Sequence, residues 1–171
     1  MSKCDPVTSV GVPFETTVHV RDHCLCLAAQ RAARTLARRF DEALQPAGLT
    51  SGQFSLLMAL NQPRPPSIGA IAALLAMDRT TLTANMKPLE RRGLVTTAVD
   101  PEDRRGRLVS LTQAGRAALR SAVPIWRRVH KEIDRLLSPA DGRTLRGGLR
   151  SLTRPARTSL RQARSARPSR P

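Results

Sequence analysis

Apolar residues recur at helical spacing in the middle of the chain, just before a change to polar residues. Four of them stand at i, i+3, i+4 and i+7, the spacing that gathers side chains on one helical face: Ile68, Ile71, Ala72 and Leu75. Asp78 follows, and its carboxylate suits a helix N-cap because it accepts hydrogen bonds from free amide groups. The pattern predicts a short buried helix, a tight turn and a second helix.

The second predicted helix has two faces of different chemistry. Leu82, Met86 and Leu89 form an apolar stripe, whereas the opposite face carries Thr80, Thr83, Ala84 and Lys87. Such a helix suits the major groove of DNA, where short polar and cationic side chains reach base edges and phosphates. Pro88 removes one backbone hydrogen bond and is expected to bend the last turns, and Gly93 suits a left-handed cap.

Two segments rich in strand-forming residues follow, residues 94–99 and 108–111, and together they predict a β-hairpin. The connector between them contains proline and glycine, which is typical of a hairpin with a longer loop. Three cations at its tip suit contacts with phosphates or with a narrow minor groove: Arg104, Arg105 and Arg107. Alone, the helix pair also fits an all-α protein and the arginines fit a solvated turn, but their order and spacing favour DNA binding.

Longer amphipathic segments flank this part of the chain. Residues 21–47 and 112–137 repeat apolar residues every three or four positions, and shorter helical patterns cover residues 50–61 and 139–152. Pro124 is expected to kink the longest helix. Long terminal helices either cap one subunit or join two. We favour a dimer, because two-fold symmetry places two recognition helices about one DNA turn apart.

Composition fits a helical protein that binds nucleic acid. Hydrophobic residues make up 40% of the 171 residues and aromatic residues only 2%, so Leu, Ala, Val and Ile must build the core, as in packed helices. The formal net charge of +16 suits a polyanionic partner. Residues 153–171 hold six arginines and no acid, and removing these six charges from +16 leaves +10 on the other residues.

The two ends of the chain lack apolar periodicity. Residues 1–20 predict a flexible arm, and residues 153–171 predict a disordered tail that attracts phosphates without selecting sequence. No apolar stretch approaches the roughly 20 residues that span a bilayer, and no signal-peptide pattern is present, so we expect a cytoplasmic protein without membrane contact. No nucleophile elbow, phosphate loop or paired metal-ligand motif is present, so we expect neither an enzyme nor a cofactor.

Residues 89–95, LERRGLV, and residues 100–115, DPEDRRGRLVSLTQAG, resemble the helix end, the wing and the next helix start of the MarR family of bacterial regulators. The resemblance implies a mainly α fold with a small β-wing, in which dimerisation helices at both ends flank a winged helix-turn-helix domain. It also implies a homodimer on a pseudo-palindromic operator in double-stranded DNA, with Arg105 in the minor groove and Asp103 bracing it. Many relatives have an arginine where this chain has Ala84.

The resemblance extends over residues 21–152, which sets the expected division of the chain. Residues 1–20 are the arm and residues 153–171 the tail. Within the domain, residues 21–47 and 112–152 dimerise and residues 50–111 form the DNA-binding lobe. The expected DNA contacts are Arg79, Thr80, Thr81, Thr83, Lys87, Arg104, Arg105 and Arg107.

The sequence leaves several means of regulation open. The resemblance implies a small aromatic or lipophilic effector between the dimerisation helices and the DNA-binding lobe. Cationic neighbours near Cys24 and Cys26 favour a reactive thiolate, which makes oxidation a second hypothesis. Because residues two apart on a helix face different directions, Cys4 or a cysteine of the partner subunit is the better disulfide mate.

Two other roles fit these side chains. The simplest is that the cysteines are small buried hydrophobes. A zinc site is the other, with ligands drawn from His19, His23, Cys24, Cys26 and His130, but their spacing matches no closed zinc motif and we expect no metal.

Two functions fit these observations. The first is a sequence-specific transcriptional regulator, a homodimeric repressor released by a small-molecule effector or by cysteine oxidation. The second is a nonspecific basic nucleic-acid-binding protein driven by charge.

Overall fold

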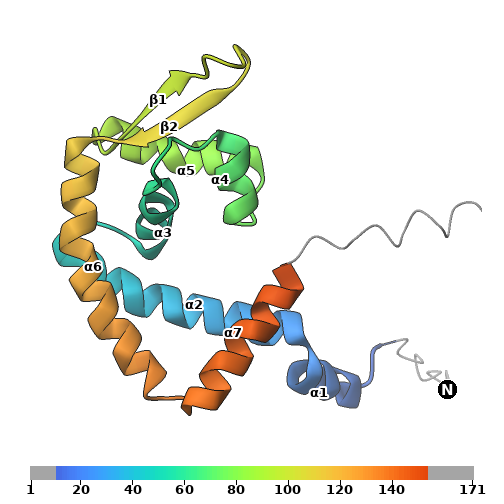
Figure 1. The fold of residues 1–171 in the computed structure, drawn as a ribbon. Coiled ribbons are helices and arrows are strands. Elements are labelled where there is room, and N and C mark those ends of the chain that lie inside the picture. The colour runs from blue at the N-terminus through green and yellow to red at the C-terminus, as the bar shows by residue number, and fades with distance from the viewer. Residues whose placement is uncertain (1–10, 154–171) are drawn as a thin grey trace, which may run out of the picture.

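Helices dominate the chain, and a single hairpin projects from them (Figure 1). The structure, a computed structural model, describes residues 11–153. In chain order its elements are α1 (Phe14–His23), α2 (Leu25–Leu44), the short 3-10 helix η1 (Gln45–Ala47), α3 (Ser51–Leu60), α4 (Ile68–Leu74), α5 (Arg79–Arg91), β1 (Val95–Val99), β2 (Arg107–Leu111), α6 (Gln113–Asp134) and α7 (Pro139–Thr153). This order confirms the predicted winged helix-turn-helix between long terminal helices.

Polar side chains cap the first turns of α4, α5 and α6, and Asp78 is the cap predicted above. Asp78 caps α5, and Ser67 caps α4 by accepting a hydrogen bond from the Ala70 amide at 3.2 Å. The Thr112 hydroxyl accepts from the Gly115 amide at 3.0 Å and donates to the Gly93 carbonyl at 2.6 Å. Thr112 therefore starts α6 and also ties that start to the end of α5.

The core of the expected DNA-binding lobe forms where α3, α4, α5 and the hairpin meet. Leu82, Met86 and Leu89 of α5 are all at most 2% exposed, which confirms the predicted apolar stripe. They belong to one buried cluster with Leu57 of α3 and Val109 of β2. Burial of such side chains stabilises the fold by about 1.5 to 3 kcal/mol each.

The apolar pattern of residues 50–61 predicts that Met58 of α3 is buried, but the structure leaves this side chain exposed. It is 41% exposed, whereas its neighbours Leu57 and Ala59 are buried. The α3 helix is apolar on several faces, so the spacing of its hydrophobic residues did not distinguish the side that packs from the side that lines a cavity.

The hairpin is antiparallel, and its register pairs Val95 with Leu111 and Val99 with Arg107. The proline-rich connector before α4 runs beside β2, where the Val109 amide donates to the Pro66 carbonyl at 3.0 Å. The connector thus covers one edge of the base of the wing. The tip extends beyond this support and projects from the molecule (Figure 1).

The arm expected at residues 1–20 is partly helical, which corrects the sequence interpretation for its second half. Residues 14–23 form α1, but no residue of this helix is buried. A helix without a buried face has no apolar stripe, so periodicity did not reveal it. Residues 1–10 and 154–171, with Cys4 and most of the predicted disordered tail, lie outside the described residues.

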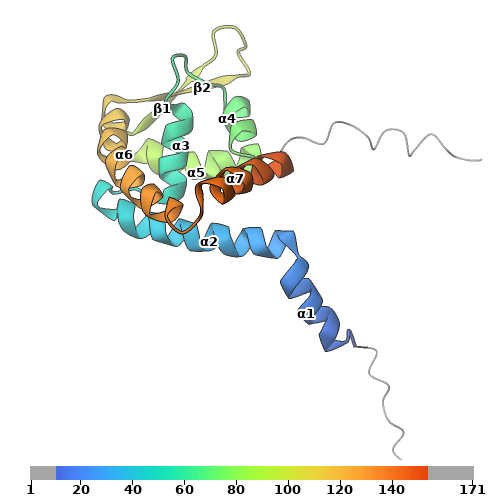
Figure 2. The same ribbon diagram turned by 60° about the horizontal axis from the view of Figure 1, so that its bottom comes forward.

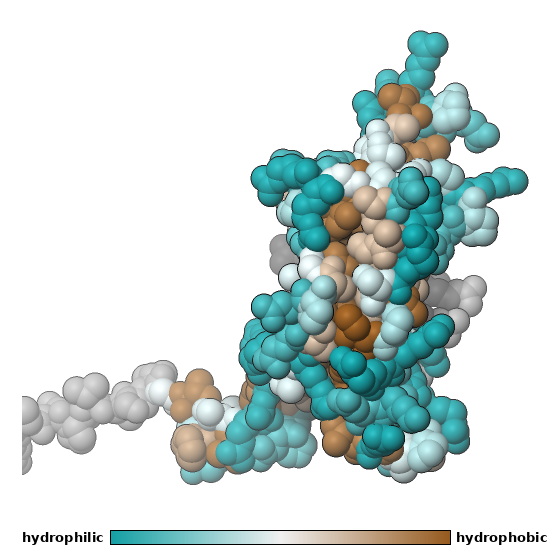
Figure 3. All heavy atoms as spheres, turned by 90° about the vertical axis from the view of Figure 1, so that its left-hand side faces the viewer, coloured by the Kyte–Doolittle hydropathy of each residue, from teal (hydrophilic) through white to brown (hydrophobic). Residues whose placement is uncertain are grey.

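The long helices carry apolar side chains that this chain leaves exposed. Leu119, Ala122 and Val129 of α6 are buried, as predicted, but Leu136 is 72% exposed and Leu152 of α7 is 66% exposed. Figure 2 shows α2 on the side of the molecule away from the hairpin, with α6 running from the base of the hairpin toward α2. In Figure 3, apolar residues run in a strip down the face that α6 presents, between charged side chains. Both α5 and α6 continue through their internal prolines.

The turn between α4 and α5 contains the one non-glycine residue with a positive φ among residues 11–153, Ala76 at φ 51°. We expect Ala76→Gly to raise the free energy of unfolding by about 0.5 to 1 kcal/mol, because the left-handed conformation costs L-residues about 1 to 2 kcal/mol and part of that gain is lost to glycine's flexibility. Urea denaturation measures the change.

Ala73→Gly is the matched control for this prediction. Ala73 is exposed within α4, so its replacement should lower stability by about 1 kcal/mol. If both substitutions destabilise equally, the strain assigned to Ala76 does not exist.

Candidate nucleic-acid interface

The first turn of α5 is closed by Asp78. Its carboxylate accepts from the Thr81 amide at 2.8 Å and from the Thr81 hydroxyl at 2.6 Å. The hydrogen bond from the Thr81 side chain, followed by that from the Thr81 amide, lowers the pKa of Asp78 below its ordinary value of 3.8. The hydroxyl proton of Thr81, an expected DNA contact, is therefore used within the cap.

The Asp78 cap makes the stability of the fold depend on pH in the acid range. A carboxylate whose folded pKa is lowered stabilises the fold above its unfolded pKa, and that contribution is lost as the pH falls through the lower folded value. Asp78→Asn keeps a good capping side chain without this titration. We expect the melting temperature of the Asp78→Asn variant to fall less than that of the wild type on acidification below pH 3.8. If thermal unfolding scans show that acidification lowers the melting temperature of both proteins equally, the prediction is wrong.

The exposed face of α5 carries the other expected contacts. The Thr83 hydroxyl donates to the Arg79 carbonyl at 2.8 Å, so Thr83 presents its methyl group and oxygen lone pairs outward. Thr80 and Lys87 are exposed and make no side-chain hydrogen bond among residues 11–153. Thr80 and Lys87 are therefore two side chains of this face whose donors are free within the described residues.

Arg79 lies along α4 rather than straight away from α5. A Cβ atom built on Gly69 would be 3.1 Å from Arg79 Nη2 and 3.7 Å from its Cζ, so the guanidinium covers this glycine. The absence of a side chain at Gly69 leaves room for the guanidinium between the two helices. The spacing of residues within α5 alone gave no sign of this placement.

The wing tip is held by two aspartates. The Asp103 carboxylate accepts from the Arg105 amide at 2.9 Å, and the Asp100 carboxylate accepts from the Glu102 amide at 2.9 Å. Asp103 thus supports the backbone of Arg105, and both bonds are Asx turns that shape the loop. Gly106 is enclosed, since a Cβ there would lie 3.0 Å from the Asp103 carbonyl oxygen.

The three tip arginines are not equivalent. Arg107 Nη1 donates to the Gly106 carbonyl at 3.0 Å and to the Arg104 carbonyl at 3.3 Å, so its guanidinium folds back onto the loop. The side chains of Arg104 and Arg105 are exposed and have no hydrogen-bond partner within the described part of the chain. Nothing in the sequence indicates the structural role of Arg107, which was expected to contact DNA like Arg104 and Arg105.

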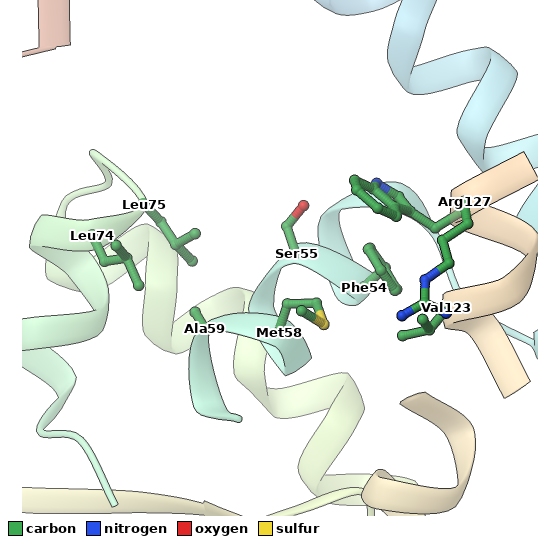
Figure 4. A pocket seen from close by; sticks show the side chains of 9 residues that line it. Phe54, Ser55, Met58, Ala59, Leu74, Leu75, Val123 and Arg127 are labelled. Atoms are coloured by element: carbon green, nitrogen blue, oxygen red, sulfur yellow. The ribbon is translucent and has the colours of Figure 1, made fainter. Parts of the chain in front are cut away.

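An apolar cavity of about 500 Å³ lies between the DNA-binding lobe and α6 (Figure 4). Its walls come from α3, α4 and α6 and the residue after α4: Phe54, Ser55, Met58, Ala59, Leu74, Leu75, Val123, Trp126 and Arg127. The rings of Phe54 and Trp126 are 6.2 Å apart, and those of Trp126 and His130 are 4.7 Å apart. The volume is that of a small-molecule site.

Cys24 lies at the break between α1 and α2, not within a helix. Its backbone is extended, with φ −76° and ψ 105°, and its sulfur accepts from the Leu27 amide at 3.4 Å. The expectation that Cys24 and Cys26 face apart on one helix was therefore built on a wrong premise. Cys26 is exposed, which contradicts its interpretation as a buried hydrophobe, and Cys24 is half-buried.

The histidines nearby pair with each other. His19 and His23 stack with ring centroids 4.2 Å apart, whereas His130 stacks on Trp126. In residues 11–153 no three His, Cys, Asp or Glu side chains come together as a metal site. No helix in the same range is long and apolar enough to cross a bilayer.

Comparisons with known proteins point to one family. The model of the MarR family matches residues 49–106. The chain is 34% identical over 119 residues to the HTH-type transcriptional repressor NicR of Pseudomonas putida, which covers 70% of this chain and 72% of NicR.

Two solved structures share the fold. The transcriptional regulator MosR of M. tuberculosis, in complex with DNA, has a TM-score of 0.70 and 35% identity and covers 85% of this chain and 100% of its own. BpsR of Bordetella bronchiseptica, whose DNA binding is regulated by 6-hydroxynicotinic acid, has a TM-score of 0.70 and 27% identity. It covers 78% of this chain and 96% of its own.

Proposed function

Because the chain belongs to the MarR family of transcriptional regulators, we propose that it is a homodimeric repressor that binds a pseudo-palindromic operator in double-stranded DNA. The observation that carries the proposal is that one lobe presents free Lys87 and Thr80 on α5 and free Arg104 and Arg105 on the wing. A helix in the major groove and a wing in the neighbouring minor groove use such side chains. The DNA-bound MosR relative supports this arrangement. Because its proposed partner is chromosomal DNA, we propose that the protein is cytoplasmic.

The proposed dimer is supported by the apolar surface of the terminal helices. Leu136, Leu145, Leu149 and Leu152 are between 44% and 72% exposed in the single chain. Burying such a patch against its symmetric copy removes apolar area from water and fixes the distance between two α5 helices. A dimer reads two half-sites and gains a specificity that one lobe lacks.

Release by an effector is the first proposed means of regulation. The apolar cavity touches α3 and α4 on the DNA-binding lobe and Val123, Trp126 and Arg127 on α6. A ligand bound there contacts both the DNA-binding lobe and α6 of one subunit. Its affinity therefore differs between conformations in which the DNA-binding lobes of the two subunits are spaced differently. Repression then ends when the ligand selects a spacing that no longer matches the two half-sites. The regulation of BpsR by 6-hydroxynicotinic acid supports a small-molecule effector.

Oxidation is the second proposed means of release. Exposed Cys26 and half-buried Cys24 lie at the joint between α1 and α2, where a change in the sulfur disturbs the cap of the long helix α2. Cys26→Ser should abolish release of operator DNA by hydrogen peroxide and leave release by an effector unchanged. If hydrogen peroxide still releases operator DNA from both the Cys24→Ser and the Cys26→Ser variants, oxidation of these thiols is not the means of release.

Specific binding and nonspecific basic binding differ in their response to salt. A duplex shift assay with competitor DNA and rising salt should retain one complex for a specific regulator, because base contacts add to the phosphate contacts. The charge of +16 favours the alternative of nonspecific binding. In that case the complexes with all duplexes dissociate over the same range of salt concentration. A retained complex supports the proposal.

Lys87→Ala tests the assigned face of α5. We expect it to weaken operator binding about 30-fold, because the dimer loses two lysine contacts of about 1 kcal/mol each, the low end for a contact to a base or phosphate. Lys131→Ala, an exposed lysine at the far end of α6, is the control and should leave affinity within about two-fold. Equal losses would show that only net charge matters.

A further inference from the structure

A second cavity continues the apolar cavity along α6. It has a volume of about 530 Å³ and is lined by Met58 and Asn61 at the end of α3 and by residues of α6. Met58, Val123 and Arg127 line both cavities. The two cavities therefore adjoin between α3 and α6, and together they are called the α3–α6 groove.

The two halves of the α3–α6 groove differ in chemistry. The half beside Phe54 and Leu75, which Figure 4 shows, is mainly apolar, and Trp126 also lines it. The second half is lined by three arginines of α6: Arg116, Arg120 and Arg127. Among residues 11–153, no acidic side chain lines either half.

The three arginines lie on one face of α6, because their positions differ by four and by seven residues. Arg116 Nη1 donates to the Leu111 carbonyl at 2.9 Å, which fixes that side chain at the start of the groove. The salt bridges within residues 11–153 involve none of the three. No salt bridge within the described part of the chain therefore compensates their positive charge. The apolar half of the groove lies next to them.

We propose that the α3–α6 groove binds an amphiphilic anion whose acyl or aryl group lies in the apolar half and whose phosphate-bearing head lies against Arg116, Arg120 and Arg127. A single carboxylate pairs with one guanidinium, whereas a phosphate ester has more charge and more acceptor oxygens for several. This inference rests on the proposed function, since it names the chemical class of the effector of the same site.

Such a ligand has two chemical sources. One is an alkyl phosphate of the lipid type, and the other is an acyl thioester of coenzyme A. Octyl phosphate and octanoyl-coenzyme A represent the two sources, octanoate has the same tail without phosphate, and coenzyme A has the head without the tail.

Trp126 provides the readout for binding. It is the only tryptophan of the chain and lines the apolar half, so changes in its fluorescence report on that half alone. In titrations of the full-length protein, we expect octyl phosphate or octanoyl-coenzyme A to bind at least about ten-fold more tightly than octanoate, because charge-assisted hydrogen bonds to the added oxygens are the stronger kind. The probe that binds more tightly identifies the source.

Variants separate the head from the tail. Arg120→Ala should weaken binding of the phosphate-bearing probe about ten-fold and binding of octanoate less than about two-fold, because it removes one charged contact with the head. Arg128→Ala is the matched control, since Arg128 is exposed on α6 and lines neither cavity. Met58→Phe, at the junction of the two halves, should weaken both probes by obstructing the groove, and it adds no second tryptophan to the fluorescence signal.

Equal affinities for octanoate and octyl phosphate, or equal losses in Arg120→Ala and Arg128→Ala, would overturn the proposed head-group site. Operator binding measured in parallel separates this result from the proposed function. A protein that binds its operator but none of the octyl probes loses the groove assignment and keeps the regulator assignment. Binding of octyl phosphate without any preference among duplexes supports the groove and contradicts the regulator.

Discussion

A Gly115→Ala variant is expected to lose about 3 kcal/mol of its free energy of unfolding, because overpacking against backbone atoms cannot relax through a side-chain rotation. Gly115 is buried in the first turn of α6. A Cβ at this position would lie 3.0 Å from the Leu94 carbonyl carbon and closer still to its oxygen. The Leu94 carbonyl is held there by the Thr112 amide, which donates to it at 3.1 Å. The base of the wing and the start of α6 would have to move apart.

Urea denaturation measures this loss, and Gly147→Ala provides the control. Gly147 lies within α7, and a Cβ there meets no atom within 4 Å. That variant should gain up to about 1 kcal/mol from the higher helix propensity of alanine. If Gly115→Ala is as stable as the wild type, the close contact between α6 and the residue before β1 is not present in solution.

Arg105→Ala should weaken operator binding about 100-fold, because a dimer loses two arginine contacts of about 1 to 3 kcal/mol each. The Arg105 side chain is exposed, while its backbone amide is fixed by Asp103 at 2.9 Å. The variant therefore removes a guanidinium without disturbing the loop. The slope of log affinity against log salt should also fall by about 2 if both arginines contact phosphates.

Fluorescence anisotropy with labelled operator DNA over a range of salt concentrations measures both effects. Arg143→Ala is the control, since Arg143 is exposed on α7 and the substitution removes the same charge. Loss of stability is excluded by comparing melting temperatures. An Arg105→Ala protein that binds the operator as tightly as the Arg143→Ala protein would show that the wing does not contact DNA.

Much of the fold followed from local chemistry that the sequence states directly. Asp78 and Thr112 cap their helices because their side chains accept from the free amides of the first turn. Gly93 takes φ 65° at the end of α5, as expected for a left-handed cap. The stripe of Leu82, Met86 and Leu89 is buried because it repeats at the helical period.

The remaining features depend on contacts between distant residues, which no local pattern encodes. The helix α1 has no buried face and hence no periodic signal. The break at Cys24 comes from its extended backbone between two helices. From the sequence, Gly115 is only an unfavourable residue within a helix. The structure gives the reason for it, since the Leu94 carbonyl leaves no room for a Cβ atom at this position.

The candidate site shows the same division. The residue types expected at a DNA interface are exposed on α5 and the wing, but their hydrogen bonds distinguish them. Thr81 and Arg107 use donors within the fold, whereas Lys87 and Arg105 keep their side chains free within the described residues. An Asp-x-x-Thr pattern at a helix start is the signal that would have identified Thr81 as part of a cap.

The central claim is that two copies of this chain place their α5 helices and wings on one stretch of B-form DNA. The most direct test is selection of duplexes from a random pool, followed by the mass of the complex on the selected sequence. We expect an inverted repeat with half-site centres about 10 base pairs apart, bound by two chains. A pool that remains random after selection, or a complex with a single chain on one half-site, would contradict it.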